Sequence, residues 1–171
     1  QARLGYTKTM AGKAVRPHVN VVVAGAGAPG LALATALGRA PKRRFSVVVC
    51  DPAIGSVPPA DDRVSAIAGG ARRLLTALGA WQHLAAQAQP IVEMEITDSR
   101  LDDAVRPTFL SFDSARGDGE PLAHMIENRA GLLALRAAAS EAGVELVAKA
   151  VESFSAQTEF VDVQATGGDI L

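Results

Sequence analysis

A glycine-rich segment and a single acid hold the residue types best suited to chemistry in this chain. The segment Gly25-Ala-Gly-Ala-Pro-Gly30 has the spacing G-x-G-x-x-G, and Asp51 follows it by about 20 residues. Glycines at this spacing let a phosphate approach the backbone, and an acid at this distance can accept hydrogen bonds from a ribose. The pattern predicts a site for the adenosine diphosphate part of a dinucleotide.

Each position of the segment has its own physical role. Gly25 allows a tight turn, Gly27 leaves room for a pyrophosphate, and Gly30 lets a helix pack close to a sheet. The first N–H groups of that helix lack intrahelical partners and can donate to an anion. Pro29 suits this position because the N–H that it removes would be unpaired in any case.

Asp51 narrows the choice of nucleotide. Its carboxylate can accept both ribose hydroxyls and would repel a 2′-phosphate, which argues against NADP at this site. The fingerprint does not separate NAD from FAD. The alternative is a buried strand–helix–strand unit whose glycines serve packing alone. The cofactor contacts that we predict here are Gly25, Ala26, Gly27, Ala28, Pro29, Gly30, Asp51 and Pro52.

The elements that must position these residues follow from apolar periodicity. We expect strands at 19–24 and 45–50 with a helix at 28–40 between them, and a parallel strand at 144–148 that follows a helix capped by Asn128. The remaining expected elements are helices at 63–79 and 81–89 and strands at 91–97, 108–112, 124–128 and 158–166. The fold class is therefore α/β, a Rossmann-like domain whose parallel sheet and helices are interrupted by antiparallel strands.

The chain divides into three parts. We expect residues 1–18 to be a flexible tail, with a basic targeting segment as the alternative, and residues 19–98 and 122–171 to form the nucleotide-binding domain. Residues 99–121 are the expected insert from a substrate domain. Because a hairpin turn signal at Gly167-Gly168 precedes only three residues, we expect a fragment of a longer protein, whose unpaired edge favours self-association or a swapped dimer.

Composition excludes several classes of protein. The 171 residues carry a net charge of −1 and only 4% aromatic side chains, which argues against nucleic-acid binding. No apolar run approaches the roughly 18 residues that span a bilayer, so we expect at most peripheral membrane association. Cys50 ends an apolar strand and is expected to be an inert core thiol.

Other reactive residue types show no pattern that predicts a role. We expect His18, His83 and His124 to be structural or exposed, and the acids of the loops at 98–120 share no metal-ligand spacing. No metal site is predicted, and the catalytic residues stay unassigned.

Three further blocks resemble one protein family. Residues 63–81 read RVSAIAGGARRLLTALGAW, residues 90–98 read PIVEMEITD, and residues 125–129 read MIENR at the start of a helix. Together these blocks resemble the ubiquinone-biosynthesis hydroxylases of the flavin-dependent aromatic hydroxylase family, which include the 2-polyprenylphenol and 2-polyprenyl-6-methoxyphenol hydroxylases. The resemblance covers about residues 19–171.

The resemblance implies FAD in the fingerprint site and a GR2-type FAD-binding domain. It also implies that Arg63 reaches the FAD pyrophosphate or ribose, although Arg63 could instead pair with Asp61 or Asp62. A side chain at the start of the later helix also touches the cofactor in this family. Both Asn128 and Arg129 fit that place, and we choose Arg129.

By the same resemblance, the parent protein is an NAD(P)H-dependent monooxygenase that hydroxylates an aromatic ring, with a polyprenylated phenol as the expected substrate. Part of the family's flavin contacts would lie beyond residue 171, so we expect this fragment alone to be inactive. The alternatives are an NAD-dependent dehydrogenase, another flavoprotein oxidase, or a non-catalytic nucleotide-binding module. The expected location is cytoplasmic, with peripheral association at the inner membrane as an option.

Overall fold

A three-stranded parallel sheet forms the centre of the computed structural model, which describes residues 19–41, 44–59, 62–117, 119–167 and 169–170. Strand β1 (Val19–Ala24) pairs along its whole length with β2 (Phe45–Cys50), and β2 pairs with β8 (Glu145–Val147). The predicted strands at 19–24 and 45–50 and the predicted parallel return strand are confirmed. The central strand β2 buries Val47, Val49 and Cys50, as expected for an apolar, β-branched run covered by helices.

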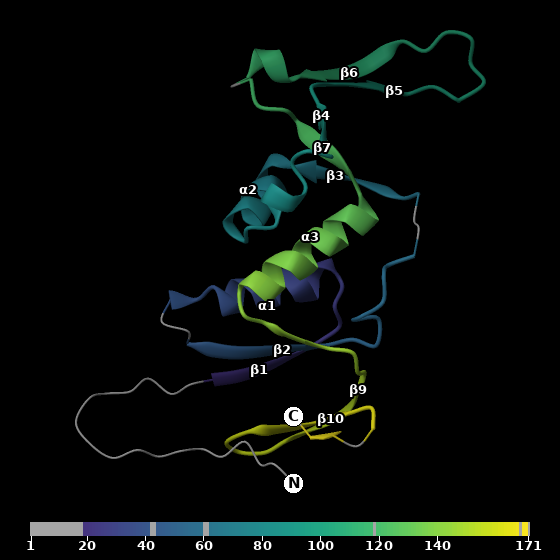
Figure 1. Cartoon of the computed structure of the whole chain (residues 1–171). Coiled ribbons are helices and arrows are strands. Elements are labelled where there is room, and N and C mark those ends of the chain that lie inside the picture. Colours follow the sequence, from purple (N-terminus) through teal and green to yellow (C-terminus); the bar gives the residue numbers. More distant parts are fainter. Residues whose placement is uncertain (1–18, 42–43, 60–61, 118, 168, 171) are drawn as a thin grey trace.

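Two helices cover this sheet (Figure 1). Helix α1 (Ala28–Gly38) connects β1 to β2, and helix α3 (Asn128–Glu141) precedes β8. Leu31, Ala34 and Ala138 are fully buried between these elements. Near the end of α1, a Cβ added to Gly38 would lie 3.0 Å from the carbonyl oxygen of Ala142, so the small residue permits the close approach of the two helix ends.

The chain between β2 and β8 builds a second, antiparallel sheet. Strand β7 (Ala123–Glu127) lies between β3 (Val64–Ala68) and β4 (Gln89–Ile91). Helix α2 (Gly69–Ala77) follows β3 and leads to a short 3₁₀ turn, η2 (Trp81–His83). The expected mixture of a parallel sheet with inserted antiparallel strands is thus confirmed at the level of a mixed α/β fold.

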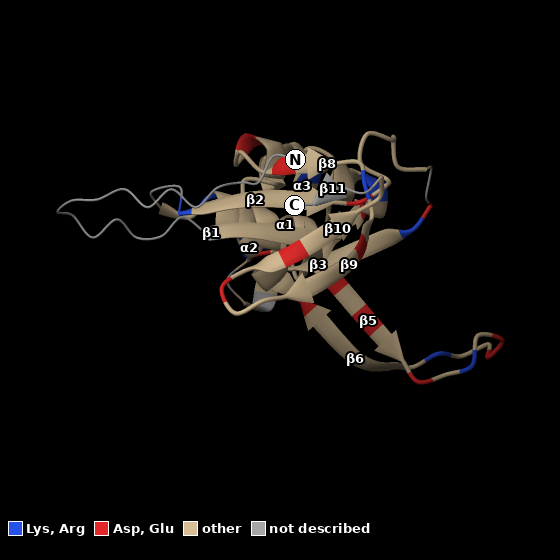
Figure 2. Cartoon of the chain, turned by 90° about the horizontal axis from the view of Figure 1, so that it is seen from below, with Lys and Arg blue, Asp and Glu red and all other residues tan. Residues whose placement is uncertain are grey.

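A long ribbon extends from the second sheet. Strands β5 (Glu93–Thr97) and β6 (Thr108–Asp113) pair only with each other, and η3 (Ser114–Arg116) follows them. Figure 2 shows this ribbon projecting away from the rest of the molecule. Strand β5 ends before residue 98, the predicted boundary between the nucleotide-binding domain and the insert, and β6 follows that boundary.

The last described residues form an antiparallel meander of β9 (Val151–Ala156), β10 (Val161–Ala165) and β11 (Asp169–Ile170). The predicted strand at 158–166 is thus shorter at its start. Gly167 has φ +93° and begins the turn into β11, as the hairpin signal predicts, while Gly168 lies outside the described residues.

Three sequence-based expectations need correction. The predicted helix at 63–79 begins only at Gly69, because residues 64–68 alternate in burial and pair with β7 as a strand. The predicted strand at 91–97 and the predicted helix at 81–89 are also too simple. Strands β4 and β5 are separate, and only Trp81–His83 is helical, because the chain enters β4 at Gln89.

Candidate nucleotide-binding site

The glycine turn, residues 25–30, joins β1 to α1. It is tightly packed at Gly30 and open at Gly27. Gly25 has φ +104°, a conformation that favours glycine, and its N–H donates to the carbonyl of Cys50 at 2.8 Å. A Cβ added to Gly30 would overlap the carbonyl oxygen of Gly25. At Gly27 the nearest atom to such a Cβ is Pro29 Cδ, 3.9 Å away. The turn is therefore closed towards the sheet and open at Gly27.

The first turn of α1 presents free donors next to this open position. Gly27 is the N-cap, and the first bond of the helix runs from the N–H of Leu31 to the carbonyl of Gly27 at 3.0 Å. The N–H groups of Ala28 and Gly30 precede that bond and have no partner within the helix. Pro29, at the second position, has no N–H to leave unpaired. Together with the helix dipole, these donors favour an anion at this end of α1.

Asp51 fastens the glycine turn to the end of β2. Its Oδ2 accepts from the N–H of Ala26 at 2.8 Å, and its Oδ1 accepts from the N–H of Ala53 at 2.8 Å. The bond from Ala26, then the bond from Ala53, and then the charge of Arg136 hold the pKa of Asp51 below its usual value, although partial burial opposes them. The carboxylate is therefore ionised and fixed beside the turn. Each oxygen still has a second lone pair for a ligand hydroxyl.

The residues predicted from the later blocks lie together. Because β3 and β7 are paired, the N–H of Asn128 donates to the carbonyl of Arg63 at 3.1 Å. Pro52 is exposed beside Asp51, and Arg63 is exposed directly before β3. Arg129 is half-buried in the first turn of α3. Pro52 follows β2, Arg63 precedes β3 and Arg129 lies in α3, and their contacts with a cofactor stay predictions.

Asn128 does not act as predicted. The N-cap of α3 is Glu127, and no side chain caps this end of the helix. The side chain of Asn128 instead accepts from the hydroxyl of Ser65 at 2.6 Å, joining α3 to β3. Asn128 is the first residue of α3 and not its N-cap, so its side chain bonds to Ser65 on β3 and not to the first turn of the helix.

Sequence reasoning missed Arg136. Its guanidinium donates to the carbonyls of Ser56 at 3.0 Å and Ala53 at 3.2 Å, both in the turn that follows Asp51. The two contacts span 80 and 83 residues of sequence, so no local pattern signals them. The position of Arg136 on the helix face that carries Arg129 is the one available hint, because seven residues make about two helical turns.

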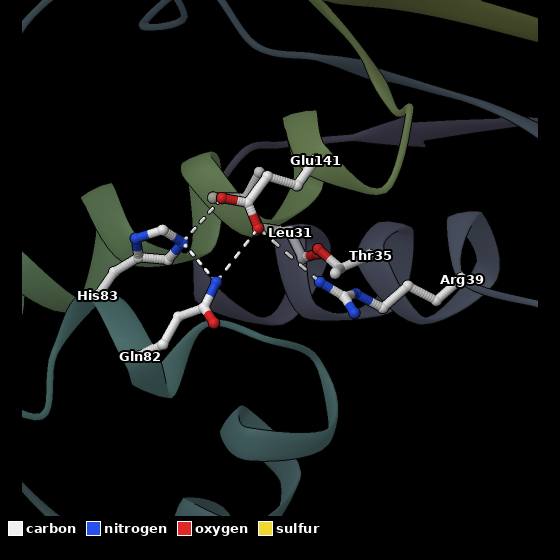
Figure 3. A network of polar contacts seen from close by, with 6 residues as sticks. All are labelled: Leu31, Thr35, Arg39, Gln82, His83 and Glu141. Carbon is white, nitrogen blue, oxygen red and sulfur yellow. Dashed lines mark hydrogen bonds and ion pairs between the residues drawn. The ribbon is translucent and has the colours of Figure 1, made fainter.

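A polar network lies at the other end of α3 (Figure 3). Glu141 pairs with His83 at 3.1 Å and with Arg39 at 3.9 Å, and Gln82 donates to it at 3.4 Å. It links α1, η2 and α3, which agrees with the structural role that we expected for His83. His124 packs its ring edge-on against Trp81, with ring centroids 5.1 Å apart, and His18 lies outside the described residues.

Cys50 is buried at the end of β2, as expected for a core thiol. Burial, and then the charge of Glu145, raise the pKa of this thiol, so it is a poor nucleophile. Within the described ranges, no cluster of three or more His, Cys, Asp or Glu side chains could hold a metal ion. In the same part of the chain, no helix is long and apolar enough to cross a membrane.

The fold is shared with several solved oxygenases and related enzymes. The chain superposes on 2-methyl-3-hydroxypyridine-5-carboxylic acid oxygenase with a TM-score of 0.61 and 20% identity, covering 90% of this chain and 36% of that one. It also superposes on the Diels-Alderase PyrE3 with a TM-score of 0.69 and 19% identity, covering 91% and 30% of the two chains. At these identities the similarity shows the fold alone.

The chain is also similar in sequence to a named protein. The chain is 36% identical over 116 residues to the ubiquinone hydroxylase UbiL of Rhodospirillum rubrum, and the match covers 64% of this chain and 24% of that protein. No protein-family model matches the chain. The resemblance to the flavin-dependent aromatic hydroxylases that the sequence blocks predict is thereby confirmed, for a chain that spans about a quarter of that relative's length.

Proposed function

We propose that this chain provides the adenosine-diphosphate-binding part of the FAD site in a flavin-dependent aromatic hydroxylase. The observation that carries the proposal is the turn at Gly27, which is open to a ligand, borders the free donors of α1 and is fixed by the ionised Asp51. These features form one edge of the parallel sheet, where ligands of α/β folds bind.

The residues present fit such a cofactor. A side chain at Gly27 would occupy the open space that a pyrophosphate needs, and the N–H groups of Ala28 and Gly30 would donate to the phosphate oxygens. Asp51 would accept the ribose hydroxyls through its remaining lone pairs. Arg63 and Arg129 would supply positive charge to the phosphates or the ribose, as the resemblance implies. The neighbouring contacts would come from Ala26 and Pro52.

The finer parts of the function rest on the relative. Bound FAD would supply the redox chemistry of ring hydroxylation, with NAD(P)H as the reductant. A ubiquinone hydroxylase among the relatives supports a polyprenylated phenol as the substrate and ubiquinone biosynthesis as the pathway. An apolar substrate of this kind would favour peripheral contact with a membrane, and we expect no turnover from this chain alone.

Titration of the purified chain with FAD, ADP and NAD tests the proposal. We expect binding of FAD and ADP, and loss of that binding in Gly27→Val. Because Gly27 has extended backbone angles and free space around it, the variant should keep the unfolding free energy of the parent chain. Gly70→Ala, in open space on α2, is the matched control and should bind normally.

The outcomes also separate the alternative functions. Affinity for NAD without affinity for FAD would favour a dehydrogenase and overturn the flavin assignment. Equal FAD affinity of the folded Gly27→Val variant and the parent chain would remove the glycine turn from the site. Absence of binding for every nucleotide would favour a module that does not bind them.

A further inference from the structure

Arg136 holds the turn that follows Asp51 from outside the nucleotide site. The side chain reaches from the middle of α3 and donates one N–H each to the carbonyls of Ala53 and Ser56. The turn between these carbonyls is closed by further bonds, from Ile54 to Asp51 and from Ser56 to Ala53. One planar guanidinium thus donates to both ends of a tight turn from two separate nitrogens, whereas a lysine would have to reach both carbonyls from a single nitrogen.

The same turn carries Asp51. Ala53 accepts from Arg136 through its carbonyl and donates to Asp51 Oδ1 through its N–H, the usual geometry of an Asx turn. Asp51 Oδ2 then accepts from the N–H of Ala26 in the glycine turn. A continuous path of hydrogen bonds therefore runs from Arg136 through Ala53 and Asp51 to Ala26. The bond from Arg136 to Ser56 ties the same turn to α3 a second time.

We propose that Arg136 is a positioning residue for the nucleotide. By holding Ala53, it keeps the Asp51 carboxylate at the place where the hydroxyls of an adenosine ribose would be accepted, without touching the nucleotide itself. This inference rests on the proposed function, since it concerns the ribose of the same adenosine diphosphate. It predicts an effect that depends on the ribose hydroxyls and not on the phosphates.

Calorimetric titration of two nucleotides distinguishes this role from a structural one. ADP offers hydroxyls to Asp51, whereas 2′,3′-dideoxy-ADP keeps the base and the phosphates but has no hydroxyl. We expect Arg136→Gln to weaken ADP binding by about tenfold, the size expected for one hydrogen bond to a charged group. The affinity for the dideoxy analogue should be the same for the variant and the parent chain. Arg136→Lys should recover part of the ADP affinity, since one carbonyl regains a donor.

Arg39→Gln is the control. Arg39 is an exposed arginine that pairs with Glu141, the last residue of α3, at 3.9 Å and has no part in the path from Arg136 to Ala26, so both nucleotides should bind this variant as they bind the parent chain. Equal weakening of ADP and of the dideoxy analogue by Arg136→Gln would show a merely structural role and overturn the inference. Unchanged ADP binding would do the same. If Arg136→Gln does not fold, Arg136→Lys gives the same comparison.

Failure of the proposed function is recognised separately. If the parent chain binds neither ADP nor FAD, the function and the inference fall together. If the parent chain binds ADP and only the ribose-dependent difference is missing, the function stands and the role of Arg136 does not.

Discussion

Two regions of the molecule differ in how far their apolar side chains are buried. One is the body, formed by the parallel sheet with α1 and α3, and the other is the ribbon of β5 and β6. In the body, Leu31, Val49 and Ala138 are fully buried, because α1 and α3 close over β1, β2 and β8. In the ribbon, four apolar residues of one face are 39–44% exposed: Met94, Ile96, Leu110 and Phe112. They are opposite one another in two pairs, Met94 with Phe112 and Ile96 with Leu110.

The difference shows which part of the chain folds on its own contacts. A two-stranded ribbon is marginally stable by itself, and this one pairs with no third strand among the described residues. Its other face carries Glu93 opposite Asp113 and Glu95 opposite Ser111, together with Phe109, which is 75% exposed. The ribbon thus leaves an apolar face exposed, while α1, α3 and the parallel sheet enclose a buried core, with Leu33 and Leu133 exposed on the outer sides of the helices. The glycine turn and Asp51 belong to the body, so the candidate site does not depend on the ribbon.

The largest expected effect comes from matched leucine deletions in the two regions. Leu31→Ala removes a fully buried side chain and should lower the unfolding free energy by about 2–5 kcal/mol. Leu110→Ala removes a side chain that is 43% exposed in the ribbon and should cost about 1 kcal/mol or less, since little cavity is left. Urea unfolding measures both. Similar losses for the two variants would mean that the ribbon and the body share one core.

The contrast also explains how much of the fold the sequence could predict. Strands β1, β2 and β8 and helix α1 were predicted well, because continuous β-branched runs and a glycine turn are local signals. Strand β3 was predicted as helix, because Ile67 fits the helical spacing of the leucines in α2. Only its pairing with β7, about 60 residues later, shows that it is a strand.

A second prediction concerns the tight packing of the glycine turn in the candidate site. Gly30→Ala places a Cβ against the carbonyl oxygen of Gly25, and a backbone atom cannot move aside cheaply, so we expect a loss of about 1–3 kcal/mol in unfolding free energy. Gly70→Ala adds the same atom in open space within α2 and should stabilise the chain by up to about 1 kcal/mol. Thermal unfolding of both variants compares them. A neutral Gly30→Ala would show that the turn is looser than its geometry indicates.

The pH dependence of stability tests the bonds of Asp51. The pKa of Asp51 is lowered below its ordinary value of 3.8, so its contribution is fully present above that pH and is lost as pH falls through the folded-state pKa. Asp51→Asn should lower the unfolding free energy at neutral pH by about 1.5–3 kcal/mol, because its amide cannot accept both backbone bonds. The difference from the parent chain should shrink below about pH 4.

Asp102→Asn is the control for that measurement, since Asp102 is exposed in the connection between β5 and β6. It should change stability little at any pH. A difference between the parent chain and Asp51→Asn that stayed constant down to pH 3 would contradict the role of the ionised carboxylate.

The candidate site could be predicted only where local sequence spacing marks its residues. The fingerprint places Gly25, Gly30 and Asp51 by local spacing, and the structure brings these residues together. Arg136 could not be found in this way, because its partners Ala53 and Ser56 are joined through backbone carbonyls, which every residue type offers. A contact to main chain across 80 residues leaves no signature in the side chains at the far end.

The smallest expected effect concerns the apolar face of the ribbon. Phe112→Lys adds a charge to that face, and because the ribbon adds little to the core, we expect the unfolding free energy to change by no more than about 0.5 kcal/mol. Binding of a hydrophobic dye should nevertheless fall, since the apolar face is interrupted between Met94 and Leu110. Ser111→Lys adds the same charge to the opposite face, across from Glu95, and should lower dye binding less than Phe112→Lys does. A loss of stability in Phe112→Lys as large as in Leu31→Ala would instead place the ribbon's apolar face in the core of the body.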